Sequence, residues 1–401
     1  MIDLVIVGAG PAGLCAAIAA AENGLKVCIL DEFIQPGGRL LGQLHQEPNG
    51  YWWNGIEEAH KLHKKAVQLG VDIHLGVSVY DLQKAEKGWF VYSSDKIFES
   101  MCLLLATGAS ETPIPVPGWT LPGVMSIGAA QVMSNVHRVK PGEKCVVIGV
   151  NVLSLAITRE LQLCGVEIEG ILLPHPNLVS GESADPERVM QSLLRLSHLA
   201  PSPFIRFGGK WVTPKLAVQF FPKKGFKMWG IPIQVRSRVL SILGEKQVEA
   251  VRIANVTPSG DSIPGTEKEI SVDFVCIAGG LTPLSELAAI AGCPFQFFAE
   301  LGGYIPLHNE YMQTDVQGLY VAGNITGIES AKVAMAQGKV AGLTISKDLK
   351  ALKDITKIED AVKNVVVTRR NAMIQFHPGI EKARTELYNE FSRSRGKMIS
   401  I

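Results

Sequence analysis

Residues 2–31 read IDLVIVGAGPAGLCAAIAAAENGLKVCILD, and this stretch decides the fold. An apolar run over 4–7 predicts a buried strand, and the glycines of 8–13 predict a tight turn before an Ala-rich helix that Gly24 ends. A second apolar strand then ends on Asp31. Strand, turn, helix, strand and terminal acid in this order are typical of a dinucleotide-binding domain.

Each glycine of this turn has its own mechanical role. Gly8 permits the turn, Gly10 lets the backbone approach a pyrophosphate, and Gly13 lets the helix pack closely on the strand. The pyrophosphate is expected at the helix N-terminus, where N–H groups and the helix dipole favour anions. Asp31, eighteen residues after Gly13, is placed to accept a hydrogen bond from an adenosine ribose. We therefore predict a bound adenine nucleotide, the alternative being a relic of the fold with an empty crevice.

Two later segments add to this site. The segment PGGR at 36–39 brings a second glycine pair that could let backbone reach a long nucleotide, with Arg39 supplying charge; the alternative is an ordinary turn. The apolar strand 101–105 runs into a turn of small residues, Ala106, Thr107 and Gly108. Such a turn returns the chain against the nucleotide, where bulky side chains would collide with it.

The composition bounds the class of protein. With 401 residues, 47% apolar residues and 40 glycines, the chain can form two domains and an appendage. Because 39 Lys and Arg balance 38 Asp and Glu, no net field attracts nucleic acid or an anionic membrane. The first strand begins at Ile2, and no apolar run reaches the roughly eighteen residues of a membrane helix. We expect a cytoplasmic protein without membrane insertion and without a nucleic-acid partner.

The seven cysteines lie at least thirteen residues apart, so the sequence has no CxxC. This spacing argues against the redox dithiol of disulfide reductases and against a local cysteine cluster for zinc or iron–sulfur. Most of the cysteines lie in apolar segments, where a free thiol behaves as a small hydrophobe.

A family resemblance rests on five motifs: GAGPAG (8–13), LDE (30–32), PGGR (36–39), LLLATGAS (103–110) and PIPVPGWTLPGVMSIGAAQ (113–131). Together they resemble the flavoproteins with two dinucleotide-binding domains. The nearest resemblance is to the α (or A) subunits of heteromeric amino-acid and amine dehydrogenases. That group includes dye-linked proline and hydroxyproline dehydrogenases, opine oxidases, hydrogen cyanide synthase and sarcosine oxidase. The resemblance extends over residues 1–345, and PGWTLPGV is its most discriminating part.

The fold class predicted from these features is α/β, with two Rossmann-like domains of the glutathione-reductase type. The second domain is inserted in the first, and a helical extension follows. We expect a nucleotide-binding domain over 1–112 and 300–346, a second Rossmann-like domain over 113–299, and an extension over 347–401 that docks on a partner.

The turn of the second domain reads GVNVLS over 149–154. Gly149 is the one fingerprint glycine retained, since Asn151 stands where backbone would approach phosphate and Ser154 replaces the packing glycine. The next strand runs over 166–173 and is followed by Pro and His, with neither an acid for a ribose hydroxyl nor an arginine for a 2′-phosphate. We predict a degenerate site that does not bind NAD(P).

The chain is expected to return to the first domain over 315–342, where a strand ends at Gly323 and Asn324 and a helix begins near Glu329. In flavoproteins of the resembled type the position of Asn324 is usually Asp, which holds the ribityl hydroxyls, and the helix N-terminus faces the flavin ring. Some members of the group bind plain adenine nucleotide in this fold. FAD is therefore the predicted cofactor, and ATP or ADP is the alternative.

The predicted cofactor-binding residues come from all these segments, and no residue is assigned to catalysis or to a metal. They are Gly8, Gly10, Pro11, Ala12, Gly13, Asp31, Glu32, Gly38, Arg39, Val79, Ala106, Thr107, Gly108, Gly323, Asn324 and Ala331.

The resemblance implies an FAD-binding subunit of a heteromeric dehydrogenase or oxidase of secondary amines or imino acids such as proline, hydroxyproline, sarcosine or an opine. Amine oxidation would take place on a catalytic β subunit of the amino-acid-oxidase type, and this chain would support electron transfer. Any FMN or two-iron two-sulfur cluster would be on, or shared with, a partner, for which a small iron–sulfur subunit is one option. The alternatives are a self-contained NAD(P)H-dependent flavin reductase and a non-redox structural subunit that binds ATP or ADP.

Two regions carry further expectations. From Lys347 onward 12 basic residues face 7 acidic ones, and apolar residues at 380, 383, 387 and 391 share one helical face. This face is predicted to dock on a second subunit, the alternative being its own domain.

Between 201 and 232, seven aromatic residues alternate with bases. They are interpreted as the core of a β meander or as a subunit interface, and a single-strand nucleic-acid site is the least favoured option.

Overall fold

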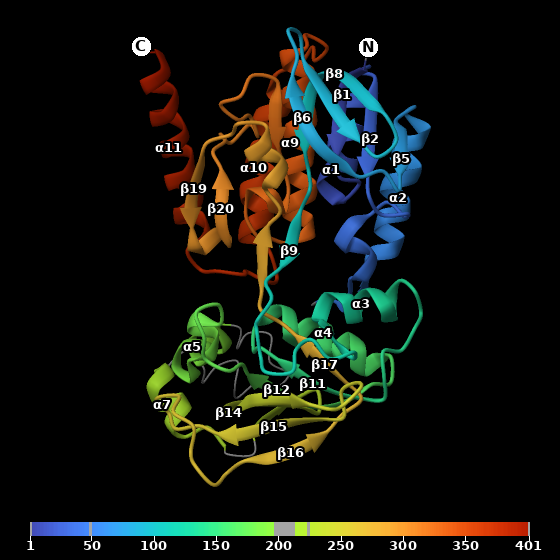
Figure 1. Ribbon diagram of the computed structural model, residues 1–401. Helices are drawn as coiled ribbons and strands as arrows, with labels where there is room; N and C mark the ends of the chain where they lie inside the picture. The colour runs from blue at the N-terminus through green and yellow to red at the C-terminus, as the bar shows by residue number, and fades with distance from the viewer. Residues whose placement is uncertain (1, 48–49, 196–212, 223–224, 400–401) are drawn as a thin grey trace. The chain divides into compact units, whose positions relative to one another are not determined.

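The computed structural model describes residues 2–47, 50–195, 213–222 and 225–399. The chain forms two compact units, coloured by residue number in Figure 1. The first comprises Met1–Gln43, Trp53–Ser110 and Leu281–Ile401, and the second comprises Leu44–Trp52 and Glu111–Gly280. The first unit thus resumes at Leu281, whereas the sequence analysis placed the return at residue 300, and it also includes residues 347–401.

A seven-stranded sheet forms the centre of the first unit, in the order β5-β2-β1-β8-β7-β6, with β21 also pairing with β8. Strands β5, β2, β1, β8 and β21 pair in parallel, while β6 and β7 add an antiparallel meander. The strands are β1 (Ile2–Val7), β2 (Val27–Asp31), β5 (Asp72–Leu75), β6 (Val79–Lys84), β7 (Trp89–Ser93), β8 (Ile97–Leu105) and β21 (Leu319–Val321).

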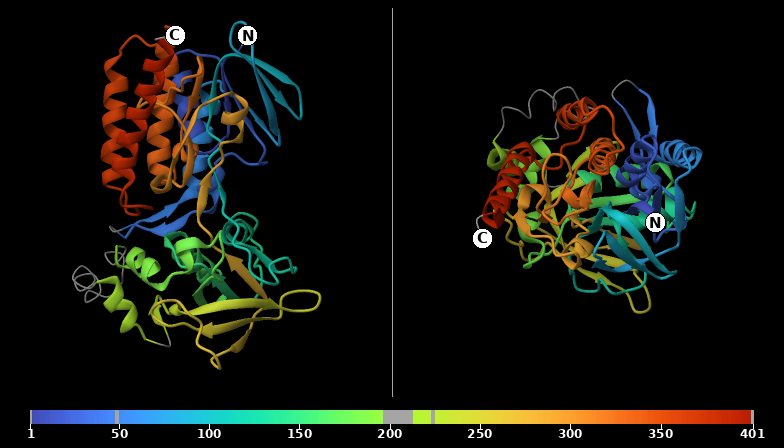
Figure 2. Two further views of the ribbon diagram at one scale, coloured as in Figure 1. Left: turned by 60° about the vertical axis from the view of Figure 1, so that its left-hand side comes forward. Right: turned by 90° about the horizontal axis from the view of Figure 1, so that it is seen from above.

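Side chains alternate along β1 because successive residues of a strand face opposite sides of the sheet. Leu4 and Ile6 pack under helices, and Val5 and Val7 pack toward the meander. The helices on the first face are α1 (Pro11–Ala21), α2 (Gly55–Gln68), α9 (Ala331–Asp348) and α10 (Thr356–Arg370), and α8 (Glu286–Ile290) lies on the other face. Figure 2 shows α9 and α10 side by side from two further directions.

Helices α1 and α9 touch through their main chains. A Cβ on Gly338 would lie 2.1 Å from the carbonyl oxygen of Ala12, and a Cβ on Gly342 would lie 2.3 Å from that of Ala16. Real Cβ atoms do not approach backbone so closely, so glycine at both positions is what allows this contact.

The C-terminal helix α11 (Ile380–Ile399) packs on its own unit. Its predicted apolar face, Ile380, Ala383, Leu387 and Phe391, is buried in one cluster with Phe298, Leu301, Ile305 and Leu307. These residues belong to or follow β19 (Phe295–Phe298), η4 (Ala299–Leu301) and β20 (Gly303–Pro306). The expectation that this face serves a second subunit was therefore wrong, and self-docking, the alternative, is what the structure shows.

An eight-stranded sheet forms the centre of the second unit, in the order β10-β17-β11-β12-β14-β15-β16, with β13 also pairing with β14. The strands are β10 (Val124–Ser126), β11 (Lys144–Ile148), β12 (Glu167–Leu173), β13 (Phe226–Met228), β14 (Ile231–Leu243), β15 (Ala250–Asn255), β16 (Lys268–Ser271) and β17 (Phe274–Ile277). The helices are α3 (Ile127–Asn135), α4 (Val152–Leu163), α5 (Pro186–Arg195) and α7 (Pro214–Gln219), with η2 (Gly181–Ala184). The predicted α/β class is confirmed, since parallel strands alternate with helices in both units.

The remaining short elements are η1 (Gly38–Gly42), β3 (Leu44–Gln46), β4 (Trp52–Asn54), β9 (Ala109–Glu111), β18 (Leu281–Pro283) and η5 (Asn324–Thr326). Within the described ranges, none of the helices combines the length and the apolar character that a membrane crossing requires.

The aromatic segment 201–232 is described only in part. Phe204, Phe207 and Trp211 lie outside the described residues. Of the others, Phe221 packs against the core of the second unit, whereas the side chain of Phe220 is exposed. The short β13 pairs with β14, which agrees with a strand hairpin in this segment.

Candidate nucleotide-binding site

Two glycines of the first turn are required by the packing of the protein itself. Gly8 has a φ of +109°, and a Cβ there would lie 2.4 Å from the carbonyl oxygen of Ala106. A Cβ on Gly13 would lie 1.9 Å from the carbonyl oxygen of Gly8. The Gly8 N–H donates to the carbonyl of Leu30 at 2.8 Å, which joins the turn to the end of β2.

Gly10 has no such reason to be glycine. Its φ of −73° and ψ of −175° suit any residue, and a Cβ there would meet no protein atom within 4 Å. Gly10 is also the N-cap of α1, and no side chain caps this helix, which begins with Pro11 and Ala12. The space in front of Gly10 and the uncapped helix start are therefore what a closely bound phosphate group would use.

The PGGR loop packs on this turn. The Gly37 N–H donates to the carbonyl of Ala9 at 2.8 Å, and a Cβ on Gly38 would lie 3.1 Å from Cα of Gly10. Arg39 instead donates from Nε and Nη2 to the carbonyl of Ala109, at 3.2 and 2.8 Å. Gly38 thus lies beside the turn of residues 8–13, while the Arg39 guanidinium joins the loop to β9.

Asp31 is bound to the turn through both carboxylate oxygens. Oδ2 accepts from the Ala9 N–H at 2.5 Å, and Oδ1 accepts from the Phe33 N–H at 2.8 Å. Burial raises the pKa of Asp31, and these two N–H donors oppose the rise. Each oxygen has a further lone pair that a ribose hydroxyl could use. The next residue, Glu32, is exposed.

The predicted residue Val79 lies at the start of β6. The Val77 N–H donates to the carbonyl of Asp31 at 2.9 Å, so the chain enters β6 beside the end of β2. Val79 itself is half-buried against the core on the meander side.

The small-residue turn after β8 lies beside the same strand end. The Ala106 N–H donates to the carbonyl of Val7 at 2.8 Å. Thr107 donates from Oγ1 to the carbonyl of Leu284 at 2.5 Å, so its hydroxyl hydrogen is used in a bond within the protein. Gly108 has a φ of +79°, and a Cβ there would meet nothing within 4 Å.

The return segment also reaches this region. Gly323 has a φ of +81°, a Cβ there would lie 2.8 Å from Cβ of Ala12, and its N–H donates to Oε1 of Gln337 at 3.0 Å. The Oδ1 of Asn324 accepts from the Glu329 N–H at 3.3 Å. Ala331 is the first residue of α9, directly after the N-cap.

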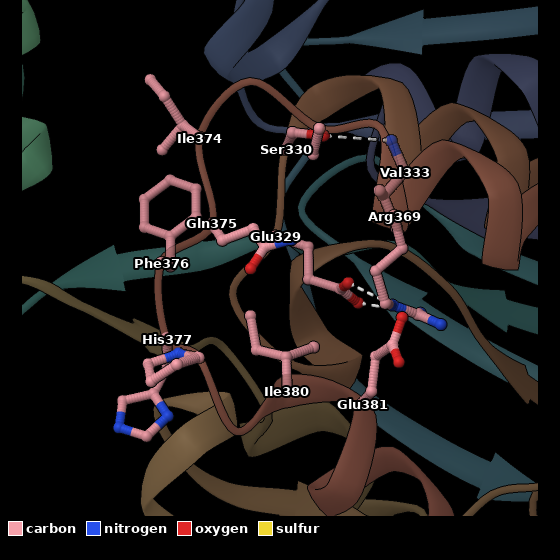
Figure 3. A pocket seen from close by; sticks show the side chains of 12 residues that line it. Glu329, Ser330, Val333, Arg369, Ile374, Gln375, Phe376, His377, Ile380 and Glu381 are labelled. Carbon is pink, nitrogen blue, oxygen red and sulfur yellow. Dashed lines mark hydrogen bonds and ion pairs between the residues drawn. The ribbon is translucent and has the colours of Figure 1, made fainter. Parts of the chain in front are cut away.

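A buried ion cluster, which the sequence analysis missed, lies just before α9 (Figure 3). Glu329 accepts from Arg369 through both carboxylate oxygens, at 2.5 and 3.0 Å, and from Nη2 of Arg384 at 2.6 Å. The side chains of Glu329, Arg369 and Arg384 are 4%, 9% and 3% exposed. Burial alone would raise the pKa of Glu329, but the guanidiniums of Arg384 and Arg369 outweigh it and hold that pKa below the ordinary value.

This cluster carries one anion and two cations. His308 is fully buried nearby, and burial together with the charge of Arg384 lowers its pKa to about 3, so it is neutral at physiological pH. Glu329 and Arg369 line a pocket of about 280 Å³, which Phe376, His377 and Ile380 help to enclose. No single residue here signalled the cluster in the sequence, because Arg369 and Arg384 lie in a region whose charges are mostly exposed.

The turn of the second unit repeats the first with one change. A Cβ on Gly149 would lie 2.2 Å from the carbonyl oxygen of Ala278, as at Gly8. Asn151, at the position equivalent to Gly10, accepts from the Ser154 N–H and donates its own N–H to Oγ of Ser154, both at 2.9 Å. Its Nδ2 also donates to the carbonyl of Ala278 at 2.8 Å. A capping box thus occupies the helix start that is uncapped in the first unit.

Family comparison agrees with this pair of related turns. The profile described as pyridine nucleotide-disulphide oxidoreductase matches residues 2–193 and 217–338. The chain belongs to this family. Membership confirms the predicted two-domain flavoprotein resemblance and the oxidoreductase class, and it is consistent with FAD.

Several relatives of this family member are named as parts of larger enzymes. The A subunit of opine oxidase from Agrobacterium tumefaciens (strain Ach5) is 29% identical over 88% of this chain and 67% of the relative. The A subunit of opine oxidase from Rhizobium meliloti is 28% identical over 90% of this chain and 65% of its own length. The HcnB subunit of hydrogen cyanide synthase from Pseudomonas aeruginosa is 25% identical over 94% of this chain and 77% of the relative. These names imply multi-subunit enzymes, and the chain spans about two thirds of the length of the opine oxidase subunits.

Solved structures of the same fold are similar to this family member. L-proline dehydrogenase from P. horikoshii has a TM-score of 0.64 at 21% identity, over 90% of this chain and 58% of that chain. Thioredoxin reductase from T. acidophilum has a TM-score of 0.62 at 21% identity, over 87% of this chain and 99% of that chain. At these identities the likeness concerns the fold.

Proposed function

We propose that this chain is the FAD-binding subunit of a heteromeric dehydrogenase or oxidase that acts on secondary amines or imino acids. The amine is oxidised on a catalytic partner subunit, and this chain supports the transfer of electrons away from it. The proposal combines the nucleotide site of the first unit with relatives named as subunits of opine oxidase and hydrogen cyanide synthase.

One observation carries the proposal: the two related turns differ in the space that they leave. At Gly10 the backbone suits any residue and no protein atom lies within 4 Å of a Cβ position. At Asn151 the side chain fills the equivalent position and caps the helix. We infer from this difference that the first turn accepts the pyrophosphate of a dinucleotide and that the second does not accept that of NAD(P).

The residues present fit an FAD. Gly10, Pro11 and the start of α1 would hold the pyrophosphate, Asp31 the adenosine ribose, and Asn324 with the start of α9 the flavin end. Bound FAD supplies a two-electron acceptor that can release electrons one at a time. The chain itself would orient the nucleotide: the hydrogen bond from the Ala9 N–H holds the Asp31 carboxylate at the turn, where it would contact the ribose.

The identity of the nucleotide is tested on the purified chain. We expect a flavin absorption spectrum and release of FAD on acid denaturation. A colourless protein that releases ATP or ADP would support the non-redox structural subunit instead. Asn324 gives that alternative its specific support, because its Oδ1 accepts from the Glu329 N–H and carries no charge.

The purified flavoprotein should not be reduced by NADH or NADPH at an enzymatic rate. The physical reason is the capping box of Asn151 and Ser154, which occupies N–H groups that a pyrophosphate would need. Anaerobic mixing in a stopped-flow spectrometer measures this directly, with dithionite as the positive control for reducible flavin. Rapid bleaching by either nucleotide would support the self-contained flavin reductase.

Amine oxidation should require a second polypeptide. We expect amine:dye oxidoreductase activity when the chain is co-expressed with the products of neighbouring genes, and a larger mass in solution than that of the chain alone. Deletion of the residues from Asp360 onward cannot test whether this region binds the partner. Ala361, Val365 and the apolar face of α11 are part of the core, so the deletion would also destabilise the chain itself. Full turnover of a secondary amine by the isolated monomer would overturn the proposal.

A further inference from the structure

Three potential metal ligands lie on neighbouring strands at one edge of the first sheet. Cys28 lies on β2, and Asp72 and His74 lie on β5. The strands pair in parallel with Cys28 opposite Asp72 and Leu30 opposite His74. Since alternate residues of a strand share a face, the three side chains project from the same side of the sheet.

The donor atoms are close together. Sγ of Cys28, a carboxylate oxygen of Asp72 and an imidazole nitrogen of His74 all lie within 4.8 Å of one another. Nε2 of His74 lies 2.9 Å from Oδ2 of Asp72, and the ring of Phe98 packs edge-on at 5.2 Å from the imidazole. Tetrahedral zinc bonds of about 2.0–2.3 Å place neighbouring ligand atoms about 3.3–3.7 Å apart. Small side-chain rotations would therefore bring these atoms to coordinating distances.

Burial is graded across the group. Cys28 is 1% exposed, while the side chains of His74 and Asp72 are 23% and 69% exposed. A metal could therefore enter from the side of Asp72, and solvent there could supply a fourth ligand. Thiolate and carboxylate together neutralise a divalent ion, and imidazole adds a neutral nitrogen ligand.

We propose that Cys28, Asp72 and His74 form a binding site for Zn²⁺ or a similar borderline-soft divalent cation, separate from the nucleotide site. A metal binds the deprotonated sulfur of Cys28, so binding would displace the thiol proton. The site would fasten β5, an edge strand, to β2, whose last residue is Asp31.

Cobalt titration tests the site, because Co²⁺ replaces Zn²⁺ and reports a bound thiolate by its charge-transfer absorption. The full chain, without a histidine tag and treated with chelator, is titrated with CoCl₂ and then with ZnCl₂. We expect one equivalent of Co²⁺, a sulfur-to-cobalt band, and loss of that band on addition of Zn²⁺. The midpoint of thermal unfolding should also rise with Zn²⁺ concentration.

Variants separate this site from adventitious binding. Cys28→Ser should abolish the charge-transfer band, and His74→Gln and Asp72→Asn should each weaken Co²⁺ binding by more than about tenfold. Asp72 is largely exposed, so its variant should fold even if Cys28→Ser does not. The matched controls are Cys102→Ser, a buried thiol on β8, and His60→Gln, an exposed histidine on α2, and both should leave binding unchanged. The proposal would be overturned if the unmodified chain showed no charge-transfer band. It would also be overturned if the Asp72 and His74 variants bound Co²⁺ as tightly as the unmodified chain does.

Discussion

Replacing Gly10 by valine should remove the bound nucleotide while leaving the chain folded. The backbone at Gly10 has ordinary extended angles, and its Cβ position is free of protein atoms, so the side chain costs the fold little. It would instead occupy the space in front of the helix start, where the pyrophosphate is proposed to bind. We expect nucleotide content to fall by at least about tenfold, which corresponds to about 1.4 kcal/mol of binding free energy. The measurement is nucleotide released per mole of protein.

Gly13→Ala is the matched control within the same turn. Its Cβ would lie 1.9 Å from the carbonyl oxygen of Gly8, so this smaller substitution should lower the free energy of unfolding. Chemical denaturation of both variants in the absence of added nucleotide separates the two effects. If Gly10→Val retained full nucleotide content, the pyrophosphate would not lie at this turn.

Replacing Glu329 by glutamine should destabilise the first unit by about 3–5 kcal/mol, because it leaves two buried guanidiniums without their counter-ion. Arg369 and Arg384 both donate to this carboxylate, and all three side chains are less than a tenth exposed. Denaturant unfolding at neutral pH measures the loss. Glu381→Gln is the control, since Glu381 pairs with Arg370 in solvent and its loss should change stability little.

The same carboxylate gives stability a defined pH dependence. The folded-state pKa of Glu329 is below its ordinary value, so its contribution is present above the unfolded-state pKa and is lost as pH falls through the folded-state pKa. The difference in unfolding free energy between the unmodified chain and Glu329→Gln should therefore shrink in acid. A difference that stayed constant from neutral pH down to acid unfolding would contradict this assignment.

The fold was largely predictable because its signals are local. Gly8, Gly10 and Gly13 lie within six residues, and the loss of Gly10's equivalent at Asn151 could be interpreted in the same way. The individual side-chain contacts between distant segments could not be predicted. The sequence does not indicate that Arg39 reaches the carbonyl of Ala109.

The C-terminal region shows the same limit. Its apolar face was predicted correctly as a helical face, but its partner, the segment around Phe298 and Ile305, lies about eighty residues earlier and has no periodicity that marks it. Likewise, Sγ of Cys145 and Sγ of Cys276 lie 3.8 Å apart on adjacent strands, although 131 positions separate them in the sequence. The cluster of Glu329 with two arginines depends on the same kind of long-range contact.

The main-chain contact of α1 with α9 has a consequence for ligand choice. Helix α1 follows its N-cap Gly10 and α9 follows its N-cap Ser330, so the helix starts that are proposed to face the two ends of the dinucleotide belong to one closely packed pair. Because Gly338 and Gly342 leave no side chain between the backbones, rotamer changes cannot alter their separation. The distance between the N-termini of α1 and α9 would therefore be fixed, and it would favour a nucleotide whose length matches that distance. We expect a docking subunit to change the surroundings of the far end of that nucleotide and to leave the distance between the two helix starts unchanged.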